Sequence, residues 1–419
     1  MTKFIILLVI VLGVIALAQL VRMYELSSKL RNRREEEIPN RDNRLNATLL
    51  FTFMIVLFIG TIYLYMHYGW VGLGEAASVH GAKVDSLMNF NLIFVTAAFF
   101  IANFLLFYFA FKYVRKPGVK AYYFPHSNKL ELIWTSIPAI FLTIVSVFGL
   151  KTWNEITSLP TDEAVRIELF SKQFDWTVRM SGDDNQLGYF DYKLTNENNP
   201  LGLVTTKTIQ DAIDSMENGA TGIKALETKL KNPNLIFGSE DYELMTTDLA
   251  RKERMVRLIH QMKARHNAEL DARANDDLVF NASDTLYLCK NQDYEFNFRA
   301  KDVIHSALFP HFRAQMNTVP GQTTRFKFTP TISTKEMREK MNDSKFHYVL
   351  LCNKICGSSH YKMKLIVVVL DKPEYDSWYK RVSTFDPANA DLCKKFRFKY
   401  PVGKGGQPVA QVSDTTAVK

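Results

Sequence analysis

The sequence predicts four membrane-spanning helices at the N-terminus, followed by an all-β outer domain with a helical insertion. Three observations predict this class. Four apolar runs long enough to cross a bilayer lie before residue 151. After residue 164, short strand-like segments alternate with turn residues. Residues 195–282 interrupt them with a helical rather than a strand-like spacing of apolar residues.

The apolar runs are Phe4–Val21, Ala47–Met66, Leu92–Phe111 and Leu132–Leu150. We divide this region into 1–46, 47–90 and 91–153, the last being a hairpin of two spans. The first run also resembles a signal peptide, because Lys3 precedes it and Ala16–Ala18 offers a cleavage site.

Loop charge predicts the orientation of the spans. Lys and Arg crowd residues 22–44 and 115–129, whereas the loop between the second and third spans carries Lys83 alone. The positive-inside rule places the two basic loops in the cytoplasm and everything after Leu150 outside. A cleaved signal would reverse this, so we interpret the first run as a retained span. The net charge of +9 clusters beside apolar segments, so we expect a membrane and no nucleic acid.

The outer domain is predicted over 154–385, with a C-terminal extension, partly disordered, at 386–419. Its strands are expected at Ala164–Phe170, Asp284–Cys289, Tyr294–Ala300, Val303–Phe309, Thr323–Thr329, His347–Leu351 and Lys364–Leu370. Within the insertion, two charged helices are expected at Thr206–Lys231 and Thr247–Ala272. The insertion is either a docking surface or a passive elaboration.

Metal chemistry concentrates in the loop after His347–Leu351. Cys352, Cys356, His360 and Met363 follow a C-x3-C-x3-H-x2-M pattern. Thiolate, thioether and imidazole together favour copper, and two thiolates can bridge two coppers. A local disulfide or a structural zinc site are the alternatives.

A second motif upstream, Asp302-Val-Ile-His305-Ser, completes the pattern. With both motifs, the chain resembles subunit II of the haem-copper cytochrome c oxidases over roughly residues 90–180 and 284–380. The resemblance implies a cupredoxin-like outer domain with a binuclear copper A centre. His305 and Met363 would complete one copper, and His360 and the backbone carbonyl of Lys354 the other, with both thiolates bridging.

Lys354 departs from the family, which usually has glutamate there. Any residue can supply the carbonyl, but the family's carboxylate also helps to bind a magnesium ion between subunits I and II. Lysine has donors and no acceptor. We therefore expect the copper site to survive the change, whereas the magnesium site is put in question.

Three further residues take roles from the resemblance. Glu131 occupies the place of a glutamate at the mouth of the family's proton pathway, although a solvated flank is the plain alternative. Phe174 and Trp176 match aromatic positions that lie over the copper site, the first being where electrons are thought to arrive. Core or interface filling is the alternative for both rings. His311 and His347 are expected to be structural.

The resemblance implies a cytochrome c oxidase subunit that accepts electrons from cytochrome c, soluble or membrane-anchored, and passes them to the haem of subunit I. Subunits I and III, and a respiratory supercomplex, are the expected partners. The expected location is a bacterial inner membrane with the copper domain on the periplasmic side. The alternatives are a quinol-oxidase-type subunit and a purely structural membrane subunit, both without copper. Cys289 and Cys393 are left as a disulfide or two thiols.

Overall fold

The computed structural model describes residues 2–30, 39–69, 72–116, 118–232 and 237–383. The chain divides into two units. The helical unit comprises Met1–Gly72 and Met88–Val145, and the β unit comprises Leu73–Leu87 and Ser146–Lys419. The predicted extension at 386–419, and Cys393 within it, lie outside the described residues.

Four long helices form where the apolar runs predict them: α1 (Thr2–Leu30), α2 (Asn40–Tyr68), α3 (Val79–Lys112) and α4 (Asn128–Thr157). Within the described part of the chain, α2, α3 and α4 are long and apolar enough to cross a membrane. Helix α1 is not among these three, so the fourth span stays a prediction.

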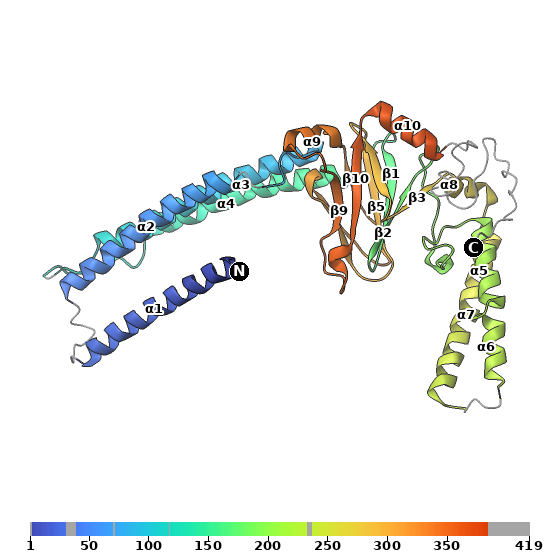
Figure 1. The fold of residues 1–419 in the computed structure, drawn as a ribbon, viewed down its shortest axis with the longest axis horizontal. Coiled ribbons are helices and arrows are strands. Elements are labelled where there is room, and N and C mark those ends of the chain that lie inside the picture. Colours follow the sequence, from blue (N-terminus) through green and yellow to red (C-terminus); the bar gives the residue numbers. More distant parts are fainter. Residues whose placement is uncertain (1, 31–38, 70–71, 117, 233–236, 384–419) are drawn as a thin grey trace. The chain divides into compact units, whose positions relative to one another are not determined.

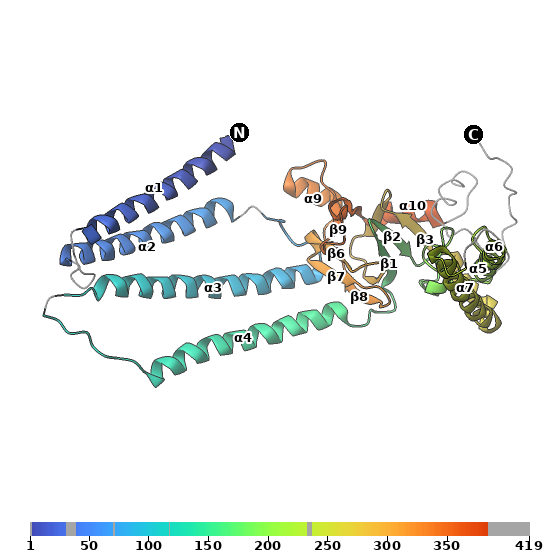
Figure 2. The same ribbon diagram turned by 90° about the horizontal axis from the view of Figure 1, so that it is seen from below.

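Aromatic side chains hold the helical unit together. Phe58 on α2 meets Phe100 on α3 edge to face, with ring centroids 4.7 Å apart. Phe94 on α3 stacks on Phe141 of α4 at 3.6 Å. Such pairs stabilise the contact between helices beyond the area they bury. Helices α2, α3 and α4 accordingly run alongside one another in Figure 2.

The β unit contains two five-stranded sheets (Figure 1). In spatial order, the first sheet comprises β3 (Leu278–Asn281), β2 (Asp175–Met180), β1 (Val165–Lys172), β5 (Tyr294–Ala300) and β8 (Thr324–Phe328). The second comprises β4 (Thr285–Cys289), β10 (Lys364–Leu370), β9 (Tyr348–Cys352), β6 (His305–Phe309) and β7 (Ala314–Thr318). Both sheets contribute buried side chains to one core. This arrangement fits the predicted cupredoxin-like class.

The predicted strands are found with small shifts at their ends, but three strands were missed. Strand β2 forms a hairpin with β1, in which Ser171 pairs with Trp176. Strand β7 forms a hairpin with β6, in which His305 pairs with Thr318. Strand β3 lies inside the range predicted for the insertion, so the β structure resumes at Leu278 and not at Asp284. A strand of four residues is too short to show a recognisable alternation of apolar and polar residues. Strand β3 is stabilised by its pairing with β2, which is far away in the sequence.

The insertion is helical, but it has more helices than predicted. They are α5 (Thr206–Asn218), α6 (Ile223–Leu230), α7 (Glu240–Arg265) and the short α8 (Asp271–Asn275). The first predicted helix is broken between Gly219, which ends α5, and Gly222, which precedes α6. Glycine disfavours helix interiors because it loses the most backbone entropy on ordering. Ile209 and Ile213 of α5 and Ile259 of α7 form a small core, and the helices extend away from the sheets on the β3 side in both ribbon views.

A segment between α2 and α3 belongs to the β unit. We call Leu73–Leu87 the strap. Ala77 in the strap is fully buried; its N–H donates to the carbonyl of His311 at 2.8 Å, and its carbonyl accepts the N–H of Thr331 at 2.9 Å. The Ser78 hydroxyl donates to the carbonyl of Phe312 at 2.7 Å. The β unit is therefore built from two separate stretches of chain.

Arg313 makes a second set of contacts with the strap. Its Nε and Nη2 atoms lie 2.8 and 3.0 Å from the two carboxylate oxygens of Asp85, and Nη2 also donates to the carbonyl of Gly74 at 2.7 Å. A bidentate guanidinium–carboxylate pair fixes orientation as well as distance.

Two further helices belong to the β unit: α9 (Thr334–Met341), and α10 (Lys372–Ser383), whose Trp378 packs on Tyr287.

Four charged side chains are buried on one side of the first sheet. Arg179 on β2 donates to Glu168 on β1 at 2.7 Å and to Asp277, just before β3, at 2.8 Å. Arg299 on β5 donates to the other oxygen of Glu168 at 2.6 Å and to the carbonyl of Leu201 at 3.1 Å. Each of these buried groups has an oppositely charged partner. The hydrogen bond from Arg299 to Leu201 links the insertion to the sheet.

Candidate metal centre

The predicted metal loop connects β9 to β10. Cys352 is the last residue of β9, and its N–H donates to the carbonyl of Met363 at 3.1 Å, which closes the loop at its base. The Sγ atoms of Cys352 and Cys356 lie 3.9 Å apart, and both residues are buried. A disulfide requires about 2.05 Å between the sulfurs. Cys289, Cys352 and Cys356 are all free thiols, so the local disulfide alternative is not supported.

Strand β6 brings His305 to this loop. Ala307 on β6 pairs with Cys352 on β9, which places His305 at the same end of the sheet as the two thiols. The Nδ1 atom of His305 lies 3.9 Å from the Sγ of Cys352, and His305 is fully buried. These three side chains form a group whose donor atoms all lie within 4.8 Å of one another, as a metal site requires.

The remaining predicted ligands lie against the thiols. The Nδ1 atom of His360 is 3.6 Å, and the Sδ atom of Met363 4.0 Å, from the Sγ of Cys356. The backbone carbonyl of Lys354 is 3.3 Å from the Sγ of Cys352. Every ligand predicted from the sequence is therefore in one cluster.

The donor set fits copper. Two thiols, two imidazoles, a thioether and a carbonyl are a soft set with too few oxygens for Mg²⁺ or Ca²⁺. Burial, and then the adjacent Cys352, raise the pKa of the Cys356 thiol to about 11. A thiolate at this place therefore calls for a compensating cation, and a coordinated metal supplies one.

Asp302 orients His305. Its carboxylate accepts a hydrogen bond of 2.9 Å from His305 Nε2, which leaves Nδ1 directed at Cys352. The same carboxylate accepts the backbone N–H groups of Gln173 and Val303, each at 2.7 Å. Partial burial opposes ionisation, but these hydrogen bonds hold the pKa of Asp302 below its usual value. A carboxylate behind a metal-ligating histidine fixes the ring and its tautomer.

Gly357 allows the β1–β2 turn to touch the metal loop. Its φ is +138°, and an added Cβ atom would lie 2.8 Å from Phe174 Cζ and 2.9 Å from Gln173 Nε2. The Gln173 side chain donates to the carbonyl of Cys356. Gln173, Gly357 and Asp302 were given no role from the sequence, although Asp302 opens the upstream motif and Gly357 lies within the Cys352–Met363 pattern.

The two predicted aromatic residues differ in their surroundings. Trp176 is fully buried, with its ring centroid 6.4 Å from that of His305. Its Nε1 atom has no hydrogen-bond partner within the part of the chain that the structure describes. Phe174 is half-buried and packs against Gly357 at the surface of the metal loop.

Other predicted residues are not members of this cluster. Glu131 is exposed in the first turn of α4. His311 packs against Phe346 and Tyr348, and burial, followed by nearby Arg313, lowers its pKa. His347 is exposed and contacts the carbonyl of Lys345. Cys289 is a buried thiol in β4, and Cys393 lies outside the described residues, so their pairing stays an open prediction.

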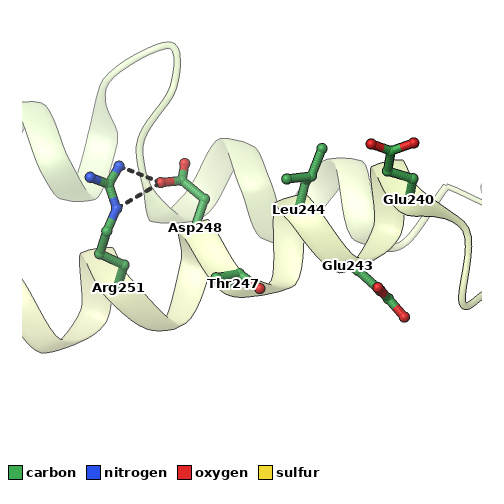
Figure 3. Close-up of a pocket in the computed structure, with 6 residues that line it drawn as sticks. All are labelled: Glu240, Glu243, Leu244, Thr247, Asp248 and Arg251. Carbon is green, nitrogen blue, oxygen red and sulfur yellow. Dashed lines mark hydrogen bonds and ion pairs between the residues drawn. The ribbon is translucent and has the colours of Figure 1, made fainter.

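A hollow on α7 is unrelated to the metal cluster. Figure 3 shows its lining on one helix: Glu240, Glu243, Leu244, Thr247, Asp248 and Arg251. Asp248 and Arg251 form an ion pair at 2.6 Å. One face of one helix with mixed charges offers no converging set of catalytic groups. Whether the insertion docks a partner stays a prediction.

Comparisons with known proteins give related subunits of one kind. The transmembrane domain of cytochrome C oxidase subunit II matches residues 66–152. The "Alternative cytochrome c oxidase subunit 2" of Bradyrhizobium diazoefficiens is 23% identical over 333 residues, covering 79% of this chain and 91% of the relative. Cytochrome c oxidase subunit 2 of Thermostichus vulcanus is 24% identical over 353 residues, covering 82% and 90%.

Among solved structures, the periplasmic domain of subunit II of cytochrome oxidase from Bradyrhizobium japonicum matches 25% of this chain and 78% of its own. Its identity is 18% and its TM-score 0.22. The sequence matches confirm the resemblance drawn from the metal loop: the chain is related to subunit II of the cytochrome c oxidases, and it is a membrane protein whose residues 66–152 correspond to that family's transmembrane domain.

Proposed function

We propose that the chain is the electron-accepting subunit II of a cytochrome c oxidase and holds a binuclear copper centre. The observation that carries this proposal is the convergence of all the predicted donors, with neighbouring donor atoms 3.3 to 4.0 Å apart. Following the family's arrangement, the thiolates of Cys352 and Cys356 would be shared by both coppers. His305 and Met363 would complete one copper, and His360 and the carbonyl of Lys354 the other.

When bound, a pair of coppers held by these residues would supply one-electron redox chemistry. The chain's own part is to keep the ligands still. Asp302 fixes the His305 ring, and Gln173 holds the carbonyl of Cys356. Met363 is buried and its carbonyl closes the loop base onto Cys352. Ligands that move little between oxidation states lower the barrier to electron transfer.

Electrons arrive, on this proposal, by way of Phe174. Its half-buried ring lies against Gly357, the residue after Cys356, whereas Trp176 is fully buried with its ring centroid 6.4 Å from that of His305. Phe174 therefore suits contact with a donor, and Trp176 suits support of the His305 ring. The donor would be a cytochrome c, soluble or membrane-anchored. The electron would then pass to the haem of subunit I.

The partners and location follow the same proposal. Subunits I and III of the oxidase, and a respiratory supercomplex, would surround the chain in a bacterial inner membrane. The strap supports the predicted orientation, because the loop between α2 and α3 packs on the β unit. That loop and the metal cluster must then lie on the same side of the membrane. With the basic loops in the cytoplasm, this side would be the periplasmic one.

Two alternatives without copper remain in view: a quinol-oxidase-type subunit and a purely structural subunit. Neither needs two free buried thiols beside two imidazoles. A zinc site could use the same thiols, but it would not need the thioether of Met363.

The test is metal analysis and EPR of the full-length chain purified from membranes. Two coppers per chain and a mixed-valence signal are expected. Cys352→Ser should abolish the signal, whereas Cys289→Ser, which removes a buried thiol outside the cluster, should leave it intact. One copper per chain, zinc in place of copper, or an unchanged signal in Cys352→Ser would refute the proposal.

A further inference from the structure

The tip of the metal loop is apolar and basic at the same time. Ile355 is 85% exposed and Tyr361 is 77% exposed. Lys354 precedes Ile355 and Lys362 follows Tyr361, and both lysines are exposed. We call these four residues the loop tip. Two large apolar side chains exposed on a loop whose base is fixed by a hydrogen bond are accessible to a partner, and basic side chains stand next to both.

The magnesium ion that the resemblance implies does not fit this tip. An ammonium group cannot ligate a cation. Asp302, the carboxylate next to the loop, already accepts hydrogen bonds from His305, Gln173 and Val303. Within the described residues, the one group with metal-binding geometry is the His305, Cys352 and Cys356 cluster, which offers no carboxylate.

The charge around the tip also disfavours a divalent cation. Lys364, at the start of β10, is exposed beside Lys362. Within the part of the chain that the structure describes, Lys354, Lys362 and Lys364 form no ion pair with a carboxylate. Three uncompensated ammonium groups repel Mg²⁺ and attract carboxylates.

We propose that the loop tip docks on a neighbouring oxidase subunit, and that the Lys354 ammonium binds a carboxylate of that subunit in place of a bridging magnesium ion. This inference rests on the proposed function. The exposed Ile355 and Tyr361 favour a permanent subunit over a transient donor, because permanent interfaces are the more apolar kind. Lys354 then fulfils two roles: its carbonyl faces the thiols and its side chain faces the partner.

The experiment uses the assembled oxidase, purified at low and high ionic strength, with wild-type chain, Lys354→Glu and Lys354→Gln. Lys335→Glu is the matched control, because Lys335 is also exposed but lies on α9. The readouts are haem co-purified per copper, and the EPR signal of Mn²⁺ after growth in manganese. Lys354→Glu should weaken the association with the haem-bearing subunit by about tenfold or more. Lys354→Gln should weaken it less, and Lys335→Glu should not change it.

Copper per chain should stay constant in all variants, and wild-type oxidase should show no Mn²⁺ signal broadened by the copper centre. Unchanged association in Lys354→Glu, or such a broadened signal in the wild type, would overturn the inference. A variant that lowers turnover with the donor but keeps its haem would reassign the tip to donor docking, and would also overturn it. Absence of copper from the wild-type chain would refute the proposed function instead.

Discussion

The Sγ atom of Cys352 lies 3.9 Å from the Nδ1 atom of His305, although 47 positions separate the two residues in the sequence. The pairing of β6 with β9 produces this contact, since Ala307 is opposite Cys352 in the ladder. The metal cluster therefore depends on the register of the second sheet. It also depends on the close approach of Phe174 to Gly357 and on the hydrogen bond between Asp302 and His305.

Gly357→Ala should disrupt the metal loop. The residue has a φ of +138°, and the new methyl group would collide with Phe174 and Gln173. We expect a shifted or lost copper EPR signal and a loss of stability of about 1–3 kcal/mol. Gly321→Ala is the control, because Gly321 also has a positive φ, +76°, but open space around it. Equal spectra for both variants would show that the contact with Phe174 does not shape the loop.

Asp302→Asn should loosen His305 without removing a ligand. The amide keeps the shape of the carboxylate but loses the negative charge that His305 Nε2 contacts at 2.9 Å. Loss of such a partner costs about 10- to 100-fold in metal affinity. Titration of the apo chain with copper in competition with a chelator measures this. Equal affinities in wild type and variant would mean that packing alone orients the ring.

Arg313→Ala should release the strap. The substitution removes the bonds to Asp85 and to the carbonyl of Gly74 at one stroke. Limited proteolysis of the full-length chain should then cut within residues 73–87 faster than in wild type. Lys340→Ala is the control, since it removes an exposed ion pair between Glu75 and Lys340, of small expected value. Equal cutting rates would show that the buried Ala77 and Ser78 hold the strap unaided.

The buried charges give a pH-dependent prediction. Burial works against the charge of Glu168, but Arg179 and Arg299 hold the pKa of its carboxyl below the usual 4.5. A carboxyl whose pKa is lower in the folded than in the unfolded state stabilises the fold at pH values above its unfolded-state pKa. This stabilisation is lost as the pH falls through its folded-state pKa. Glu168→Gln should therefore lower the unfolding free energy most near neutral pH, and this destabilisation should decrease below about pH 4.5.

Chemical unfolding of both proteins across pH measures this difference. The comparison is needed because burial raises the pKa of Asp277, in the same network, to about 7. Asp277 therefore makes the unfolding free energy of wild type and variant alike depend on pH between about pH 4 and 7. Subtracting the two unfolding free energies removes this shared contribution. A difference that is independent of pH down to pH 3 would contradict the assignment of Glu168 as charged.

Glu131→Gln should slow turnover of the assembled oxidase while leaving the copper spectrum unchanged. Glu131 is exposed in the first turn of α4, so the substitution costs little folding energy. A slower oxygen-consumption rate with an intact spectrum would support a role in proton uptake. Unchanged turnover across pH would identify Glu131 as a flanking charge.

The sequence predicts local features well and non-local ones poorly. Lys364–Leu370 is found as β10 with the predicted limits, because an apolar run directly after the ligand loop is a strong signal. The six proposed ligand positions were named from the sequence, since ligand chemistry constrains residue type and spacing together, and the structure brings these residues into one cluster. Strand β3 and the strap could not be predicted, because each forms through contacts with residues far along the chain. Phe174 could be named, but its contact with Gly357 required the fold.

The strap imposes an order on biosynthesis. Ser78 hydrogen-bonds to Phe312, which is 234 positions later in the chain. At a synthesis rate of about 5–20 residues per second, Ser78 emerges roughly 10–50 s before its partner exists. During that interval Ala77 and Ser78 remain uncovered at the membrane surface, and the β unit cannot close around them. The β unit can therefore finish folding only after most of the chain has been made, because its first stretch has to wait for a partner 234 positions later.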